Sequence, residues 1–86
     1  MTANAAYATA IPERWTGPGR LMRTAFTIEG KQAFRLELGG QYVYVTAQPG
    51  INLESYVEKN VRVYGAMVYR TGERVTHMTA TQVIPQ

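Results

Sequence analysis

The chain has 86 residues, 45% of them hydrophobic, with a formal net charge of +3 and no cysteine. This length allows one small domain with one core, and the hydrophobic content disfavours disorder. The lack of cysteine excludes disulfides, a thiol nucleophile and thiolate metal ligands.

Targeting and membrane signals are weak along the whole chain. No apolar run approaches the roughly 18–20 residues that a membrane-spanning helix needs, so no membrane insertion is expected. The first ten residues, MTANAAYATA, lack a basic segment and a continuous apolar stretch, and they do not predict an intact signal peptide. These features leave the compartment unknown.

The N-terminal residues 1–13 are rich in Ala and Thr and show no sustained period, which predicts a flexible arm before a single domain at 14–86. The segment WTGPG, which starts at Trp15, predicts a turn because its Pro cannot donate to a sheet ladder. Residues 20–28 predict a first strand that bends near Thr24 and Ala25, followed by a hairpin loop at 29–31.

The next two strands form the clearest pattern in the sequence. Residues 34–38 alternate strictly, with three apolar side chains on one face and Arg35 and Glu37 on the other. Gly39-Gly40 is a two-residue hairpin signal, and residues 41–46 return as a strand. In this strand the valines point to one side, and Tyr42 and Tyr44 point to the other.

A short helical segment interrupts the strands after Pro49-Gly50. Asn52 is a suitable N-cap, and Leu53, Tyr56 and Val57 form an apolar stripe, which predicts one or two turns of α or 3-10 helix. Asn60 can end this segment in a left-handed conformation. Two more strands follow at 61–69, with a break at Gly65, and at 75–84, with a loop at 71–73 between them.

This order predicts an all-β fold, a small five-stranded antiparallel OB-like barrel with one short helix between strands 3 and 4. An SH3-type barrel is the alternative, but it would need an extra strand in residues 4–11, which have little β-propensity. The predicted core consists of Leu21, Phe34, Leu36, Leu38, Val43, Val45, Leu53, Val57, Val61, Val63, Val68 and Val83, with Met22, Met67 and Met78 as filler.

A resemblance supports this fold from Trp15 onward. The pattern W-x-G-x-G-x-L, P-G-x-N-L-x-x-Y-V, V-x-V-Y-G, Y-R and H-M-T-A-x-x-V resembles small bacterial β-barrel modules of OB or SH3 type, some of which accompany SH3-like domains in multidomain proteins. The matching positions are glycines, turn prolines and core valines. The resemblance therefore implies a non-enzymatic binding or structural module and carries no functional residue with it.

Catalytic and metal-binding groups are scarce. The chain has one His, His77, one Ser, Ser55, and no Asp, so a triad would have to combine these two with a Glu. Ser55 is more simply interpreted as a residue of the helix end and His77 as a strand residue. No metal-binding spacing and no phosphate-binding glycine loop is present. We therefore expect no enzyme and no cofactor.

The remaining candidate is a surface that we call the Tyr/Arg face: Arg35, Tyr42, Tyr44, Arg62 and Tyr64, all predicted to point outward. OB-folds bind single-stranded nucleic acid with such residues, because aromatic rings stack on bases and cations follow phosphates. The same residues also stabilise sheets by packing alone. The leading hypothesis is a protein partner or self-association through this face, and the alternative is single-stranded nucleic-acid binding. Trp15 is either a buried plug or an exposed anchor.

Overall fold

The structure is a computed structural model that describes residues 12–86, and it consists mostly of β-strands. The elements in chain order are β1 (Glu13–Trp15), β2 (Gly19–Ile28), β3 (Lys31–Leu38), β4 (Gln41–Ala47), the 3-10 turn η1 (Leu53–Tyr56), β5 (Asn60–Arg70) and β6 (Val75–Pro85). The predicted N-terminal arm lies outside the described residues except for Pro12 and Glu13, and Glu13 already begins β1. No helix within residues 12–86 is long and apolar enough to cross a membrane.

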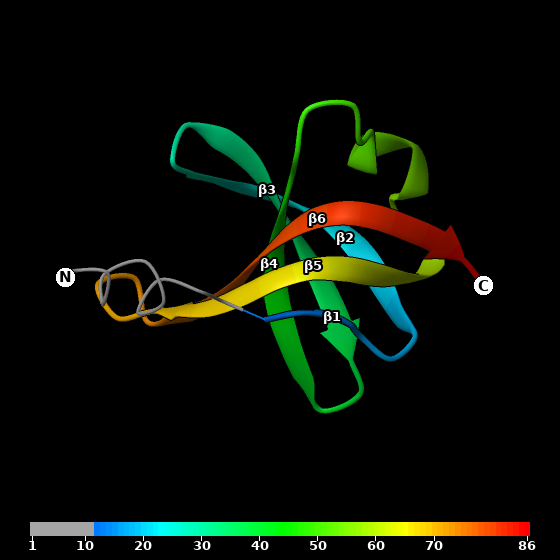
Figure 1. Ribbon diagram of the computed structural model, residues 1–86, viewed down its shortest axis with the longest axis horizontal. Coiled ribbons are helices and arrows are strands. Elements are labelled where there is room, and N and C mark those ends of the chain that lie inside the picture. Colours follow the sequence, from blue (N-terminus) through cyan, green and yellow to red (C-terminus); the bar gives the residue numbers. More distant parts are fainter. Residues whose placement is uncertain (1–11) are drawn as a thin grey trace, which may run out of the picture.

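Five of the strands pair in a closed ring in the order β2-β3-β4-β6-β5, and β5 returns to β2 through Gly19 and Val61 (Figure 1). Four of the five pairings are antiparallel, whereas β4 and β6 run parallel, with Tyr44 opposite His77. The predicted all-antiparallel pairing is therefore wrong at one junction. The reason is that strand direction reverses at every antiparallel pairing, so a closed ring of five strands must contain at least one parallel pair.

A sixth strand, β1, lies beside β5 where the sequence predicted only a turn, with Trp15 opposite Tyr64. Thr16 fixes this strand, because its N–H donates to the Val63 carbonyl at 2.8 Å and its Oγ1 accepts from the Val63 N–H at 3.0 Å. Gly17-Pro18 then separates β1 from β2. The chain thus lays two collinear strands along the same edge of β5.

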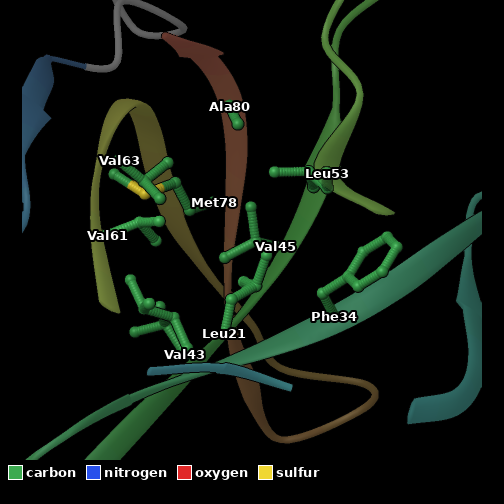
Figure 2. Packing of buried hydrophobic residues seen from close by; sticks show 10 residues of the cluster. Leu21, Phe34, Val43, Val45, Leu53, Val61, Val63, Met78 and Ala80 are labelled. Carbon is green, nitrogen blue, oxygen red and sulfur yellow. The ribbon is translucent and has the colours of Figure 1, made fainter. Parts of the chain in front are cut away.

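The core lies inside the ring, where aliphatic side chains from every ring strand point toward one another (Figure 2). Eight predicted core residues are buried there: Leu21, Phe34, Leu36, Val43, Val45, Leu53, Val61 and Val63. Leu38, Val57 and Val83 are partly buried against this cluster, as is Met67. Met78 and Ala80 are fully buried and complete it.

Two predicted core residues lie outside: Met22, which is partly exposed opposite Arg35 and belongs to neither core cluster, and Val68, with 39% of its surface exposed. Met22 lies on the outer face because it alternates with the buried Leu21.

For Val68 the reason is the register of β5. The prediction assumed that Gly65 shifts the alternation of β5. The register shift instead skips Thr81 in β6, since Tyr64 pairs with Gln82 and Gly65 pairs with Ala80. The inward phase of β5 therefore continues past Gly65, and Val68 stays on the outer face.

Gly65 is required at this bulge by a close approach of two backbones. A Cβ at position 65 would overlap the carbonyl oxygen of Thr79, and a Cβ at Gly19 would lie 2.5 Å from the carbonyl oxygen of Glu37. In contrast, a Cβ at Gly17 would meet nothing within 4 Å. The ring closes tightly at positions 19 and 65 because these residues have no side chain.

The predicted short helix is a single 3-10 turn, η1, which lies in Figure 1 at the opposite end of the ring from the β3–β4 turn. Asn52 caps it as predicted, because its side-chain oxygen accepts the Glu54 N–H at 3.1 Å. Val57 is already extended, and the Glu58 N–H donates to the Leu21 carbonyl at 2.6 Å. This bond draws the chain back to the sheet, so Glu58 adopts the left-handed conformation instead of Asn60.

Candidate functional site

The structure divides the predicted Tyr/Arg face into two groups on different parts of the ring. Arg35 on β3 lies directly opposite Tyr44 on β4, and Tyr42 lies two residues away on the same strand. Arg62 and Tyr64 lie on β5, where Tyr64 faces Trp15 of β1. The two groups make separate sets of contacts and are described separately.

Tyr44 was predicted to be exposed, but the structure buries it: only 8% of its surface is accessible. Its side chain lies outside the main core and forms a second, smaller apolar cluster with Ile28 and Ala33, against which Val75 packs. The β2–β3 hairpin supplies the cover because β2 changes register between Arg23 and Thr27. The bend predicted near Thr24 and Ala25 therefore places the end of the hairpin over the outer face of β4.

Phe26, which the sequence analysis did not select, completes a line of three rings that we call the aromatic row: Phe26, Tyr44 and Tyr42. The Phe26 and Tyr42 rings each meet Tyr44 edge-on, with centroid distances of 5.4 and 5.5 Å and an interplanar angle of 76° in both pairs. The outer two rings are 53% and 54% exposed. A buried ring thus holds two half-exposed rings in fixed positions.

Arg35 flanks the aromatic row without offering a free charge. Its guanidinium carbon lies 6.0 Å from the centroid of the Tyr42 ring, which is a cation–π distance. Its Nη2 and Nε atoms lie 2.9 and 3.0 Å from Oε2 of Glu37. The Arg35 side chain is therefore oriented by two neighbours, and its charge is balanced within the same strand.

A hollow of about 300 Å³ opens beside the aromatic row. The residues that line it come from three strands and one turn: Phe26, Thr27, Ile28, Tyr44, Glu73 and Val75. Through Glu73 the hollow is linked to Arg70, which joins the turns of the β2–β3 and β5–β6 hairpins, with Nη1 at 3.1 Å from Oε2 of Glu29 and Nε at 3.2 Å from Oε1 of Glu73. Both hairpins reach the same side of the molecule in Figure 1.

The second group, which we call the tryptophan patch, consists of Trp15, Arg62 and Tyr64. The rings of Trp15 and Tyr64 are 5.2 Å apart, and the guanidinium carbon of Arg62 lies 5.9 Å from the centroid of the Trp15 ring. Nε of Arg62 donates to the Thr16 carbonyl at 3.1 Å. Trp15 and Tyr64 are partly buried against each other because β1 pairs with β5, whereas Arg62 is exposed.

The single His and the single Ser have structural partners. His77 is 4% exposed, and its Nε2 shares a hydrogen bond of 2.7 Å with Oγ1 of Thr46. Burial, together with the charge of Arg70, lowers the pKa of His77 below 6.5. Ser55 Oγ donates to the Asn52 carbonyl at 2.9 Å. Within residues 12–86, no group of three or more potential ligands is placed to hold a metal ion.

Sequence reasoning missed Phe26 and the Arg70 bridge for a physical reason. Phe26 lies within the register change of β2, between Arg23 and Thr27, so the face that it occupies could not be read from the alternation. Its aromatic character in a strand with a predicted bend was the only signal. The Arg70–Glu29 pair joins residues 41 positions apart and left no local pattern.

The chain was compared with protein-family models and with curated proteins, and neither comparison gave a match. We therefore infer a function from the geometry of the aromatic row, the hollow and the tryptophan patch.

Proposed function

We propose that the chain is a non-catalytic OB-like binding module that recognises a protein partner, or a second copy of itself, through the aromatic row. The ring order β2-β3-β4-β6-β5, the parallel β4–β6 pair and the turn η1 between the third and fourth ring strands support an OB-type barrel. OB-folds bind ligands on the face of their second and third strands and on two flanking loops. In this chain that region is β3 and β4 with the turns at Glu29 and Glu73.

The observation that carries the proposal is the half exposure of Phe26 and Tyr42 on either side of a buried Tyr44. Large aromatic side chains in rigid positions are the residues that dominate protein interfaces, because they bury much apolar surface and lose little side-chain entropy on binding. The apolar hollow beside them provides a concave element for the same surface. A flat, fully packed sheet face would lack both features.

The charges around the row favour a protein over nucleic acid. Arg35 is paired with Glu37, and Arg70 is shared between Glu29 and Glu73, so the two arginines nearest the row are accompanied by three carboxylates. A protein binds a phosphate backbone mainly because its Lys and Arg side chains neutralise phosphates and release the counterions of the nucleic acid. Carboxylates in the same place repel it. A protein segment tolerates this mixed charge.

The test uses the intact chain and a paired substitution, Phe26→Ser with Tyr42→Ser, on the exposed rings of the row. A matched control carries Ile84→Ser, because Ile84 is 45% exposed and lies at the far end of β6. We expect the wild type and the control to retain a protein partner, or a concentration-dependent dimer in light scattering, and the double variant to lose it at least tenfold. A folded double variant that keeps every partner, together with a wild-type monomer at all concentrations, would contradict the proposal.

Single-stranded nucleic acid is the second candidate, and it is favoured by the two stacked Arg–aromatic pairs, Arg35 with Tyr42 and Arg62 with Trp15. The measurement is fluorescence anisotropy with a mixed-sequence oligonucleotide at about 50 mM and about 200 mM salt, where phosphate contacts lower affinity steeply. Binding at the lower salt that Arg35→Gln weakens would favour this candidate. The absence of binding at that salt would remove it.

A further inference from the structure

The hollow beside the aromatic row has an apolar floor and a rim whose exposed charge is negative. Ile28 and Tyr44 on the floor are 6% and 8% exposed, and Phe26 and Val75 form the walls. Glu73 lines the hollow, and Arg70 joins it to Glu29; we call these three residues the rim. The side chains of Glu29 and Glu73 keep 64% and 51% of their surface exposed, whereas Arg70 between them keeps only 25%. One covered cation is thus shared by two exposed carboxylates.

Glu29, Arg70 and Glu73 together carry a formal charge of −1, and the two carboxylates are more exposed than the guanidinium. Arg74, which lies between Glu73 and Val75 in the chain, is exposed but does not line the hollow, and neither does Lys31. Lys31 lies opposite Ile28 in the β2–β3 ladder, but it lines a different hollow, between this hairpin and the segment 47–54. Arg35 lies at the other end of the aromatic row and is balanced by Glu37.

We propose that the hollow is an anchor site for an apolar side chain of the partner, aliphatic or aromatic, which carries a positive charge next to it. This inference rests on the proposed protein-binding function and specifies its partner as an apolar and basic segment. The floor supplies the affinity through buried apolar surface, and the exposed carboxylates of Glu29 and Glu73 select the sign of the neighbouring charge. An acidic segment with the same apolar side chain binds more weakly.

The test uses two small probes of the same shape and opposite charge, phenethylamine and 3-phenylpropionate. Each is titrated into the isotope-labelled intact chain at neutral pH and low salt, and the backbone amide shifts are followed by NMR. We expect both probes to shift the amides of Phe26, Ile28, Tyr44 and Val75. Phenethylamine should bind about three to ten times more tightly, because exposed ion pairs contribute modestly and the carboxylate probe is repelled. Added salt should reduce this ratio.

Paired substitutions separate the rim from the floor. Glu29→Gln with Glu73→Gln changes the rim charge from −1 to +1, so the preference should reverse toward 3-phenylpropionate. Glu54→Gln is the matched control, because Glu54 is also an exposed carboxylate paired with an arginine, Arg23, but it does not line this hollow. It should leave the ratio unchanged. Phe26→Ala removes one wall and should weaken both probes at least fivefold.

The outcomes distinguish this inference from the proposed function. Equal affinity of the two probes, or tighter binding of 3-phenylpropionate to the wild type, would overturn the charge preference while leaving the aromatic row as a protein-binding surface. If neither probe shifts the amides around the hollow, the anchor site is overturned. The proposed function is then judged independently by the partner and light-scattering measurements on the Phe26 and Tyr42 variant.

Discussion

The aromatic row and the tryptophan patch both place aromatic rings on the outside of the same ring of strands, yet only the aromatic row has exposed rings. In the tryptophan patch, strand β1 lies along β5, Trp15 packs on Tyr64, and Arg62 donates to the Thr16 carbonyl. In the aromatic row, Tyr44 is covered by the β2–β3 hairpin, but Phe26 and Tyr42 remain half exposed beside a hollow.

The difference shows that exposure depends on what the rest of the chain covers. Val61 to Tyr64 and Tyr42 to Val45 have similar alternation, but Tyr64 is partly buried against Trp15 of the paired strand β1, whereas Tyr42 remains 54% exposed. An aromatic residue that its own chain covers contributes mainly to stability, whereas one left open at a concave site is available for binding. Substitutions in the two regions should therefore separate stability from binding.

The largest effect is expected at the backbone contact beneath the tryptophan patch. Gly65→Ala should lower the free energy of unfolding by about 3 kcal/mol, because the new Cβ overlaps the Thr79 carbonyl and forces β5 and β6 apart. Gly17→Ala is the control and should change it by less than about 0.5 kcal/mol, since nothing lies within 4 Å of its Cβ. Urea unfolding measures both. Equal stabilities would show that the bulge is not held as described.

Within the aromatic row, the buried ring and the exposed ring should behave differently. Tyr44→Ala should cost about 2–3 kcal/mol in urea unfolding, because it empties the cluster around Ile28 and Ala33. Tyr42→Ala, at a ring that is 54% exposed, should cost less than about 1 kcal/mol. A larger loss for Tyr42 than for Tyr44 would reverse the roles given to the two tyrosines.

The tryptophan patch should act on stability alone. Trp15→Ala should cost about 2 kcal/mol, since it removes an aromatic pair and a cation–π contact and uncovers β5. Trp15 is the only tryptophan in the chain, so its emission reports on this patch. Phenethylamine at the hollow should leave that emission unchanged. A change in emission on binding would show that the two regions are coupled.

The smallest effect concerns His77, which lies opposite Tyr44 in the β4–β6 ladder. Burial, followed by the charge of Arg70, lowers the pKa of this group in the folded state below 6.5, against the opposing effect of Glu29 and Glu73. The unfolded chain then binds more protons, so the free energy of unfolding should fall as the pH drops below about 6.5. Denaturation midpoints between pH 7.5 and 5.5 measure this dependence, and His77→Gln should reduce it. A midpoint that rises on acidification would contradict the assigned direction.

Local patterns predicted much of this fold. Strict alternation located β3 and β4, Gly39-Gly40 marked their hairpin, and Asn52 capped the predicted turn. Eight of the predicted core residues are buried inside the ring, because alternating valines and leucines determine the inner face of a strand whose phase is uninterrupted. The errors at Val68 and Phe26 occur at the two register changes. The change beside Gly65 falls at Thr81 in β6 and leaves the phase of β5 uninterrupted, so Val68 lies on the outer face. The change after Arg23 hid the position of Phe26.

Side-chain alternation is a local property, and it was enough to predict a strand-rich domain with an aliphatic interior and outward-facing tyrosines and arginines. Which of those residues are exposed depends on contacts between distant segments. The burial of Tyr44, the pairing of Trp15 with Tyr64 and the Arg70 bridge between two hairpins all join segments far apart in the chain. Such contacts depend on how far a strand bends and where a bulge falls, and neither is encoded by the period of the pattern.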